Sequence, residues 1–129
     1  MTLTEWLFSA MLALAPPDRP AAHHSYPGHV ETVTERADRY RAIAEDVAAV
    51  AEERPVFPGA TGARRTAALV LAIFKHESDF AHDVDVGPCW RGRDGTSARC
   101  DHDRSACMGQ IRIGAGRTPE GWTREDLFA

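Results

Sequence analysis

An apolar helical stretch that ends in a single carboxylate sets the strongest constraint on how this chain can fold. Residues 66–77 have a helix-forming composition, and apolar side chains recur through them at helical spacing. On a period of 3.6 residues, Val70, Ile73, Phe74 and Glu77 share one face. Glu77 therefore either marks the point where the helix reaches solvent or lines a cleft. In a cleft, loss of water disfavours the charged carboxylate, which suits a proton donor.

The composition bounds the classes of protein to which the chain can belong. A length of 129 residues with 43% hydrophobic residues fits a globular domain with a modest core. The formal net charge is −4, and no basic face stands out along the sequence. A nucleic-acid partner is therefore not expected.

The N-terminal segment is apolar but does not have the features of a membrane span. Residues 7–15 are far shorter than the roughly 20 residues that cross a bilayer. No lysine or arginine precedes them, and Glu5 lies where a signal peptide carries positive charge. Thr2 and Glu5 instead have the spacing of a capping box that opens a helix. An atypical or cleaved export signal that ends near Ala15 stays open as the alternative.

Capping boxes, apolar periodicity and prolines predict three helices, over residues 3–15, 33–53 and 63–78. Residues 18–29 are rich in histidine, proline and glycine and are expected to form an exposed linker. Residues 79–106 are expected to be irregular, whereas residues 108–113 are expected to form an extended piece or a turn. We therefore divide the chain into accessory helices and a linker over 1–60 and a second domain over 61–129.

A fourth helix is predicted to begin after Thr123, which has the character of an N-cap. The sequence continues for only about one helical turn, and a helix this short does not support itself. The second domain is therefore expected to be incomplete at its C-terminus.

The three cysteines, Cys89, Cys100 and Cys107, fall within 19 consecutive residues. Such clustering indicates a crosslink or a metal site, and the favoured interpretation is one disulfide in an oxidising compartment, with one thiol left over. Which two cysteines pair stays open. The alternative is a zinc-binding module with His102 as the fourth ligand, although no Cys-x₂-Cys pair is present.

Two motifs resemble the superfamily of soluble lytic transglycosylases and goose-type lysozymes. The first is Glu77-Ser78-x-Phe80 at a helix end, where that family has Glu-Ser-x-Phe. The second is Ser105-x-Cys107-Met108-Gly109-Gln110-Ile111, where the family has Ser-x-Gly-Leu-Met-Gln-Ile. The resemblance covers roughly residues 67–113 and implies a mainly α, lysozyme-like (α+β) fold with little sheet.

The resemblance also implies an activity that needs neither a cofactor nor a metal. Glu77 is expected to be the lone acid/base of a lytic transglycosylase that cleaves the β-1,4 bond between N-acetylmuramic acid and N-acetylglucosamine in peptidoglycan. Ser78 is expected to shape the cleft and Gln110 to donate to substrate or to Glu77. Met108 and Ile111 are expected to pack beneath the cleft floor. The implied protein is a monomer of the cell envelope, the extracellular space or a phage.

Two other functions stay open on the same scaffold. A hydrolytic muramidase would need a second carboxylate to position water, and the sequence does not choose among its candidates: Asp83, Asp85, Asp94, Asp101 and Asp103. A non-catalytic peptidoglycan-binding or structural protein is the other alternative. It is favoured by the altered Cys107-Met108-Gly109 segment and by the lack of a counterpart to the family's later helices. Trp90 and Trp122 either stack on sugar rings or pack within the protein.

Overall fold

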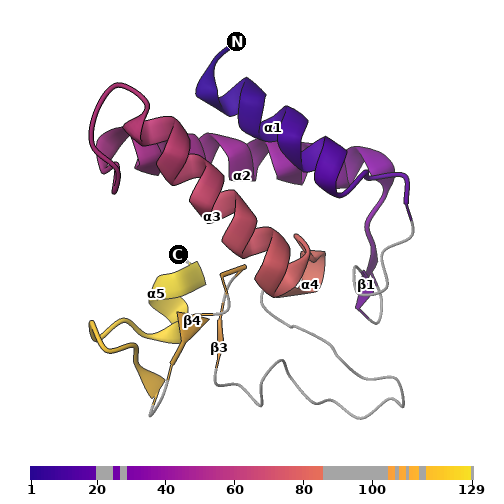
Figure 1. Ribbon diagram of the computed structural model, residues 1–129. Helices are drawn as coiled ribbons and strands as arrows, with labels where there is room; N and C mark the ends of the chain where they lie inside the picture. Colours follow the sequence, from indigo (N-terminus) through magenta and orange to yellow (C-terminus); the bar gives the residue numbers. More distant parts are fainter. Residues whose placement is uncertain are drawn as a thin grey trace. The chain divides into compact units, whose positions relative to one another are not determined.

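A computed structural model of the protein describes residues 1–19, 25–26, 29–85, 105–106, 108–109, 111–113 and 116–128. The chain divides into two compact units. Unit 1 comprises Met1–Pro20 and Thr32–His76, and unit 2 comprises Ala21–Glu31 and Glu77–Ala129. The described residues are mainly α-helical (Figure 1), which confirms that part of the predicted fold class.

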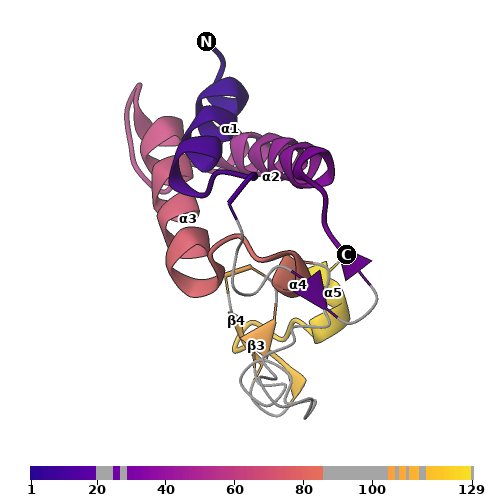
Figure 2. The ribbon, with the colours of Figure 1, turned by 90° about the vertical axis from the view of Figure 1, so that its right-hand side faces the viewer.

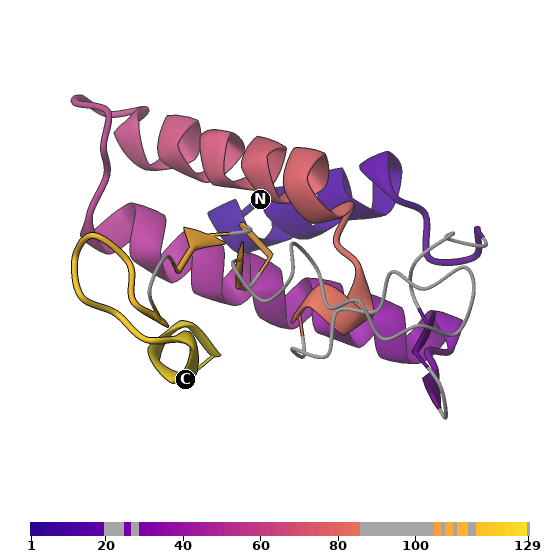
Figure 3. The same cartoon turned by 90° about the horizontal axis from the view of Figure 1, so that it is seen from below.

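Unit 1 is built from helices. α1 (Leu3–Leu14) packs against α2 (Val33–Glu53), and α3 (Gly62–Ser78) begins in this unit. Figure 3 shows the unbroken course of α2. The predicted helix over 33–53 is confirmed, and the ends of α1 and α3 differ from their predicted ends by one residue each. Among the described residues, the helices lack the length and hydrophobicity that crossing a bilayer requires.

Capping boxes fix where α1 and α2 begin. The Thr2 and Thr32 hydroxyls accept hydrogen bonds from the backbone N–H groups of Glu5 and Glu35, at 3.1 Å and 3.2 Å. The two glutamates accept bonds in return from the threonine backbone N–H groups. Each box satisfies donors that a helix start otherwise leaves without partners.

The core of unit 1 comes from apolar side chains at helical spacing on all three helices. Leu7, Met11 and Tyr40 are fully buried. The remaining buried hydrophobic residues of the helices in this unit are Ile43, Ala44, Val47, Ala48, Ala51, Ala67 and Leu71. Arginine side chains stack over aromatic rings of the same unit, including Arg41 on Phe8 at 4.2 Å and Arg64 on Trp6 at 4.8 Å.

Thr66 ties the loop before α3 to the first turn of that helix. Its hydroxyl donates to the carbonyl of Gly62 and accepts from the backbone N–H of Val56, at 2.9 Å and 3.0 Å. Gly62 is buried, and a β-carbon at this position would collide with the carbonyl oxygen of Phe57. Only glycine therefore fits the start of α3 without movement of the loop.

The described residues of unit 2 form small antiparallel hairpins and two short helices. β1 (Ser25–Tyr26) pairs with β2 (His29–Val30), and β3 (Ser105–Ala106) pairs with β4 (Ile111–Arg112). α4 (His82–Asp85) lies against β1, and α5 (Arg124–Phe128) lies against β3 (Figure 2). The prediction of an irregular linker over 18–29 was wrong at β1 and β2, and the prediction for 79–106 was wrong at α4 and β3.

Candidate functional site

The end of α3 presents the predicted catalytic residue to solvent. Glu77 is exposed in the last turn of the helix, whereas the next residue, Ser78, is 8% exposed. A carboxylate at a helix C-terminus opposes the helix dipole, which favours basic residues there, such as Lys75 and His76. Helix stability therefore does not account for Glu77 at this position.

A tight turn follows Glu77 and Ser78 directly. The backbone N–H of Ala81 donates to the carbonyl of Ser78 at 3.0 Å. Between them, Asp79 and Phe80 have φ values of 53° and 54°, in the left-handed region. Two successive positive φ values are characteristic of a type I′ turn, which glycine, asparagine and aspartate usually occupy. Asp79 therefore suits the turn, whereas for a bulky residue such as Phe80 the left-handed conformation costs about 1–2 kcal/mol.

Burial of the residues around the turn offsets its strain. Phe80 is fully buried, and Ala81 and Val84 of the same segment form a buried apolar pair. α4 continues from the turn, with the Asp85 N–H donating to the carbonyl of Ala81 at 3.0 Å. The Glu-Ser-x-Phe motif thus forms a strained helix end in which the Phe80 ring is buried and the Glu77 side chain is exposed, where a ligand can reach it.

The two histidines that flank the first motif have different environments. His76 is exposed on α3, whereas His82 is 8% exposed at the start of α4. A histidine beside a helix end is usually solvated, and His82 departs from this. The sequence signal for its burial is its position among the apolar residues Phe80, Ala81 and Val84.

The second motif lies on the β3–β4 hairpin. Ser105 pairs with Arg112 and Ala106 with Ile111, so the residues between the strands form a short connection. Met108 is 6% exposed, which agrees with a packing role. Ile111 is 38% exposed, so it is less covered than Met108. Ile113, which follows β4, is buried, at 6%.

Several predicted site residues lie outside the described residues. They are Gln110 and the cysteines Cys89, Cys100 and Cys107, together with His102 of the alternative zinc set. Within the described ranges, no group of three or more metal-ligating side chains is present. Among the candidates for a second carboxylate, Asp85 is half-buried at the end of α4.

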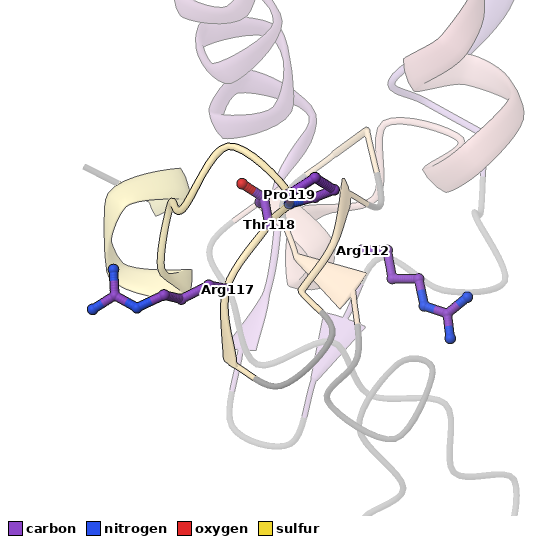
Figure 4. A pocket seen from close by; sticks show the side chains of 4 residues that line it. All are labelled: Arg112, Arg117, Thr118 and Pro119. Atoms are coloured by element: carbon purple, nitrogen blue, oxygen red, sulfur yellow. The ribbon is translucent and has the colours of Figure 1, made fainter.

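A loop that is held by internal hydrogen bonds lies between the hairpin and α5 in the sequence. The Thr118 N–H donates to the Trp122 carbonyl at 2.8 Å, and the Trp122 N–H donates to the Thr118 hydroxyl at 3.1 Å. Next to this loop is an open surface hollow of about 460 Å³, lined by Arg112, Arg117, Thr118 and Pro119 (Figure 4). Sequence reasoning did not identify this hollow, because Arg112 and the loop carry no motif.

The structure therefore brings the two motifs into one compact unit. Glu77, Ser78 and the β3–β4 hairpin all belong to unit 2. No protein-family model, curated protein or solved structure significantly matches the chain.

Proposed function

We propose that unit 2 cleaves the glycan strands of peptidoglycan as a lytic transglycosylase with a lysozyme-like fold, and that Glu77 is its acid/base. The observation that carries this proposal is the strained turn at Asp79 and Phe80. Left-handed residues with side chains concentrate at functional sites, where the surrounding structure holds them in place. Here the strain directly follows an exposed carboxylate that helix stability does not explain.

The chemistry needs one carboxyl that changes its protonation state twice. Glu77 would first donate its proton to the glycosidic oxygen between N-acetylmuramic acid and N-acetylglucosamine. It would then accept the proton of the muramic 6-hydroxyl, whose oxygen attacks C1 and closes a 1,6-anhydro ring. Because Glu77 is exposed in the free protein, the bound strand itself would exclude water from the carboxyl.

Substitution of Glu77 tests this proposal. Glu77→Gln keeps the shape of the side chain but can act neither as an acid nor as a base, so we expect release of fragments from purified sacculi to fall at least 100-fold. Glu53→Gln is the matched control, because Glu53 is an exposed residue on α2 that pairs with its neighbour Arg54. Equal activity of Glu77→Gln and the wild-type protein, or no activity in either, would overturn the enzyme proposal. The second result would favour a non-catalytic peptidoglycan-binding protein.

Mass spectrometry of the products separates the two enzymatic mechanisms. A transglycosylase leaves 1,6-anhydromuramic ends, which are 18 mass units lighter than the reducing ends that hydrolysis leaves, since water is not added. The proposed reaction requires no cofactor. Its substrate locates the protein in the cell envelope, outside the cell or in a phage particle, and we propose that it acts there as a monomer.

A further inference from the structure

Trp122 exposes more of its side chain than a packing role requires. Its exposed fraction is 55%, although tryptophan is on average among the most buried residues. It lies in unit 2, the unit that contains Glu77 and the β3–β4 hairpin. Packing within the protein, one of the two roles open for Trp122 from the sequence, therefore accounts for less than half of this side chain.

The backbone on the N-terminal side of Trp122 is fixed by hydrogen bonds. Thr118 and Trp122 bond to each other through two contacts, and the Gly121 N–H donates to the Thr118 carbonyl at 2.9 Å. Arg117 donates from its guanidinium to the Gly121 carbonyl at 2.8 Å. An aromatic residue on a loop fixed in this way loses little conformational entropy when a ligand binds.

The C-terminal side of Trp122 is fixed by the cap of α5. The Thr123 hydroxyl accepts from the Asp126 N–H at 3.2 Å, and the Asp126 carboxylate accepts from the Thr123 N–H at 2.7 Å. Trp122 thus takes the position before the N-cap, where an apolar residue often packs on the fourth helical residue, here Leu127. Such packing uses one face of a ring, so the exposed fraction of Trp122 still leaves surface for a ligand.

The neighbouring hollow indicates the chemistry of that ligand. Figure 4 shows the guanidinium groups of Arg112 and Arg117 extending in opposite directions, away from each other. They do not converge on one point, so the hollow is not a two-arginine clamp for a carboxylate or phosphate. Its centre is formed by Thr118 and Pro119, and the charged donors lie at its rim. Neutral, hydroxyl-rich ligands match this arrangement better than anions.

We propose that Trp122 is a stacking platform for a pyranose ring of a β-1,4-linked N-acetylhexosamine strand. The C–H bonds on one face of the sugar would lie on the electron-rich face of the indole. The sugar hydroxyls and acetamido groups would take hydrogen bonds from the rim of the hollow. Arg112 belongs to β4, the strand that carries Ile111 of the second motif, so the hollow and that motif share a strand. This inference rests on the proposed function for its choice of sugar.

Binding measured without turnover tests the platform. In a Glu77→Gln background, we expect titration calorimetry with the tetramer of β-1,4-linked N-acetylglucosamine to show about tenfold weaker binding for Trp122→Ala. Trp122→Phe keeps an aromatic face and should lose about threefold or less. Val50→Ala, at an exposed apolar position on α2, is the control and should bind like the parent. Thermal unfolding of each variant checks folding, and the bonds that fix the loop at Trp122 come from its main chain and survive the substitution.

Two results would overturn the platform. One is a tetramer affinity that Trp122→Ala leaves unchanged, or the absence of tetramer binding in the parent. The other is a concentration-dependent oligomer, seen by sedimentation, that Trp122→Ala dissolves, because the indole would then be a protein contact. Equal release of sacculus fragments by Glu77→Gln and the wild-type protein is a separate outcome. It would overturn the enzyme proposal but would not affect the measured binding of the tetramer.

Discussion

Ala81 donates its backbone N–H to the carbonyl of Ser78 at 3.0 Å, and this bond closes a turn with two left-handed residues. The bond reverses the chain at the end of α3 without a glycine. Glu77, immediately before the turn, stays exposed, whereas Phe80 within it is fully buried. Asp79 and Phe80 therefore end α3 directly after the exposed Glu77.

The difference in unfolding free energy between glycine and alanine at position 79 reports the strain of the left-handed backbone there. We expect Asp79→Gly to be about 1 kcal/mol more stable than Asp79→Ala, because only alanine retains the β-carbon that the left-handed region disfavours. Both variants lose the same carboxylate, so their difference isolates the backbone. Urea unfolding measures it.

Position 68 provides the control for this comparison. Ala68 is exposed within α3, where glycine is less stable than alanine by about 0.5–1 kcal/mol. Ala68→Gly should therefore show the opposite sign. An Asp79→Gly variant less stable than Asp79→Ala would mean that residue 79 is not left-handed in solution.

Phe80 is expected to be the main source of stability in the turn. Phe80→Ala removes a fully buried ring and should lower the free energy of unfolding by about 3–5 kcal/mol. Val56→Ala, at a side chain that is 68% exposed, should change it by about 0.5 kcal/mol or less. Chemical denaturation of both variants checks the contrast, and a loss at Phe80 no larger than that at Val56 would contradict the burial.

The helices of unit 1 were predictable because their signals are local. α2 has a capping box at its start, apolar side chains at helical spacing and a proline soon after its end, and its predicted bounds match. The strands were not predictable as elements, because two residues are too few to show an alternating pattern. Their pairing depends on the opposite strand, which periodicity in one segment does not report.

The sequence identified the two motifs of the candidate site, but it did not predict which face of α3 is buried or the turn that follows the helix. The sequence placed Val70, Ile73, Phe74 and Glu77 on one apolar face, yet Ile73 is 42% exposed. The buried face of α3 passes instead through Ala67, Leu71 and Ser78, so Ile73 and Glu77 lie together on its exposed side. The turn at residues 79 and 80 was missed because neither residue is glycine.

The cap of α2 should contribute measurably to unit 1. Thr32→Ala removes the hydroxyl that accepts from the Glu35 N–H, and we expect a loss of about 1 kcal/mol in unfolding free energy. Thr32→Ser retains the acceptor and should stay close to the wild type. Thr34→Ala is the same change at an exposed position within the first turn and should have little effect. An equal loss at Thr32 and Thr34 would show that the capping bond contributes nothing.

The cap of α5 should make the carboxyl of Asp126 a reporter of the loop that holds Trp122. Hydrogen bonds from the Thr123 backbone and then from its side chain lower the pKa of Asp126 below its ordinary value of 3.8. A lowered folded-state pKa stabilises the folded chain above the unfolded value, and this contribution disappears as the pH falls through the lowered pKa. The cap should therefore be complete at neutral pH and weaken only below about pH 3.8.

Carbon-detected NMR titration of the Asp126 carboxyl measures this behaviour. Thr123→Ala should raise the pKa of Asp126 toward 3.8, because the hydroxyl bond is lost and the end of the helix is less well held. Thr123→Ser should keep it low. Trp122 fluorescence followed over the same pH range should change together with the Asp126 titration, since both report the start of α5. A Thr123→Ala variant whose Asp126 still titrates like the wild type would show that the cap does not form in solution.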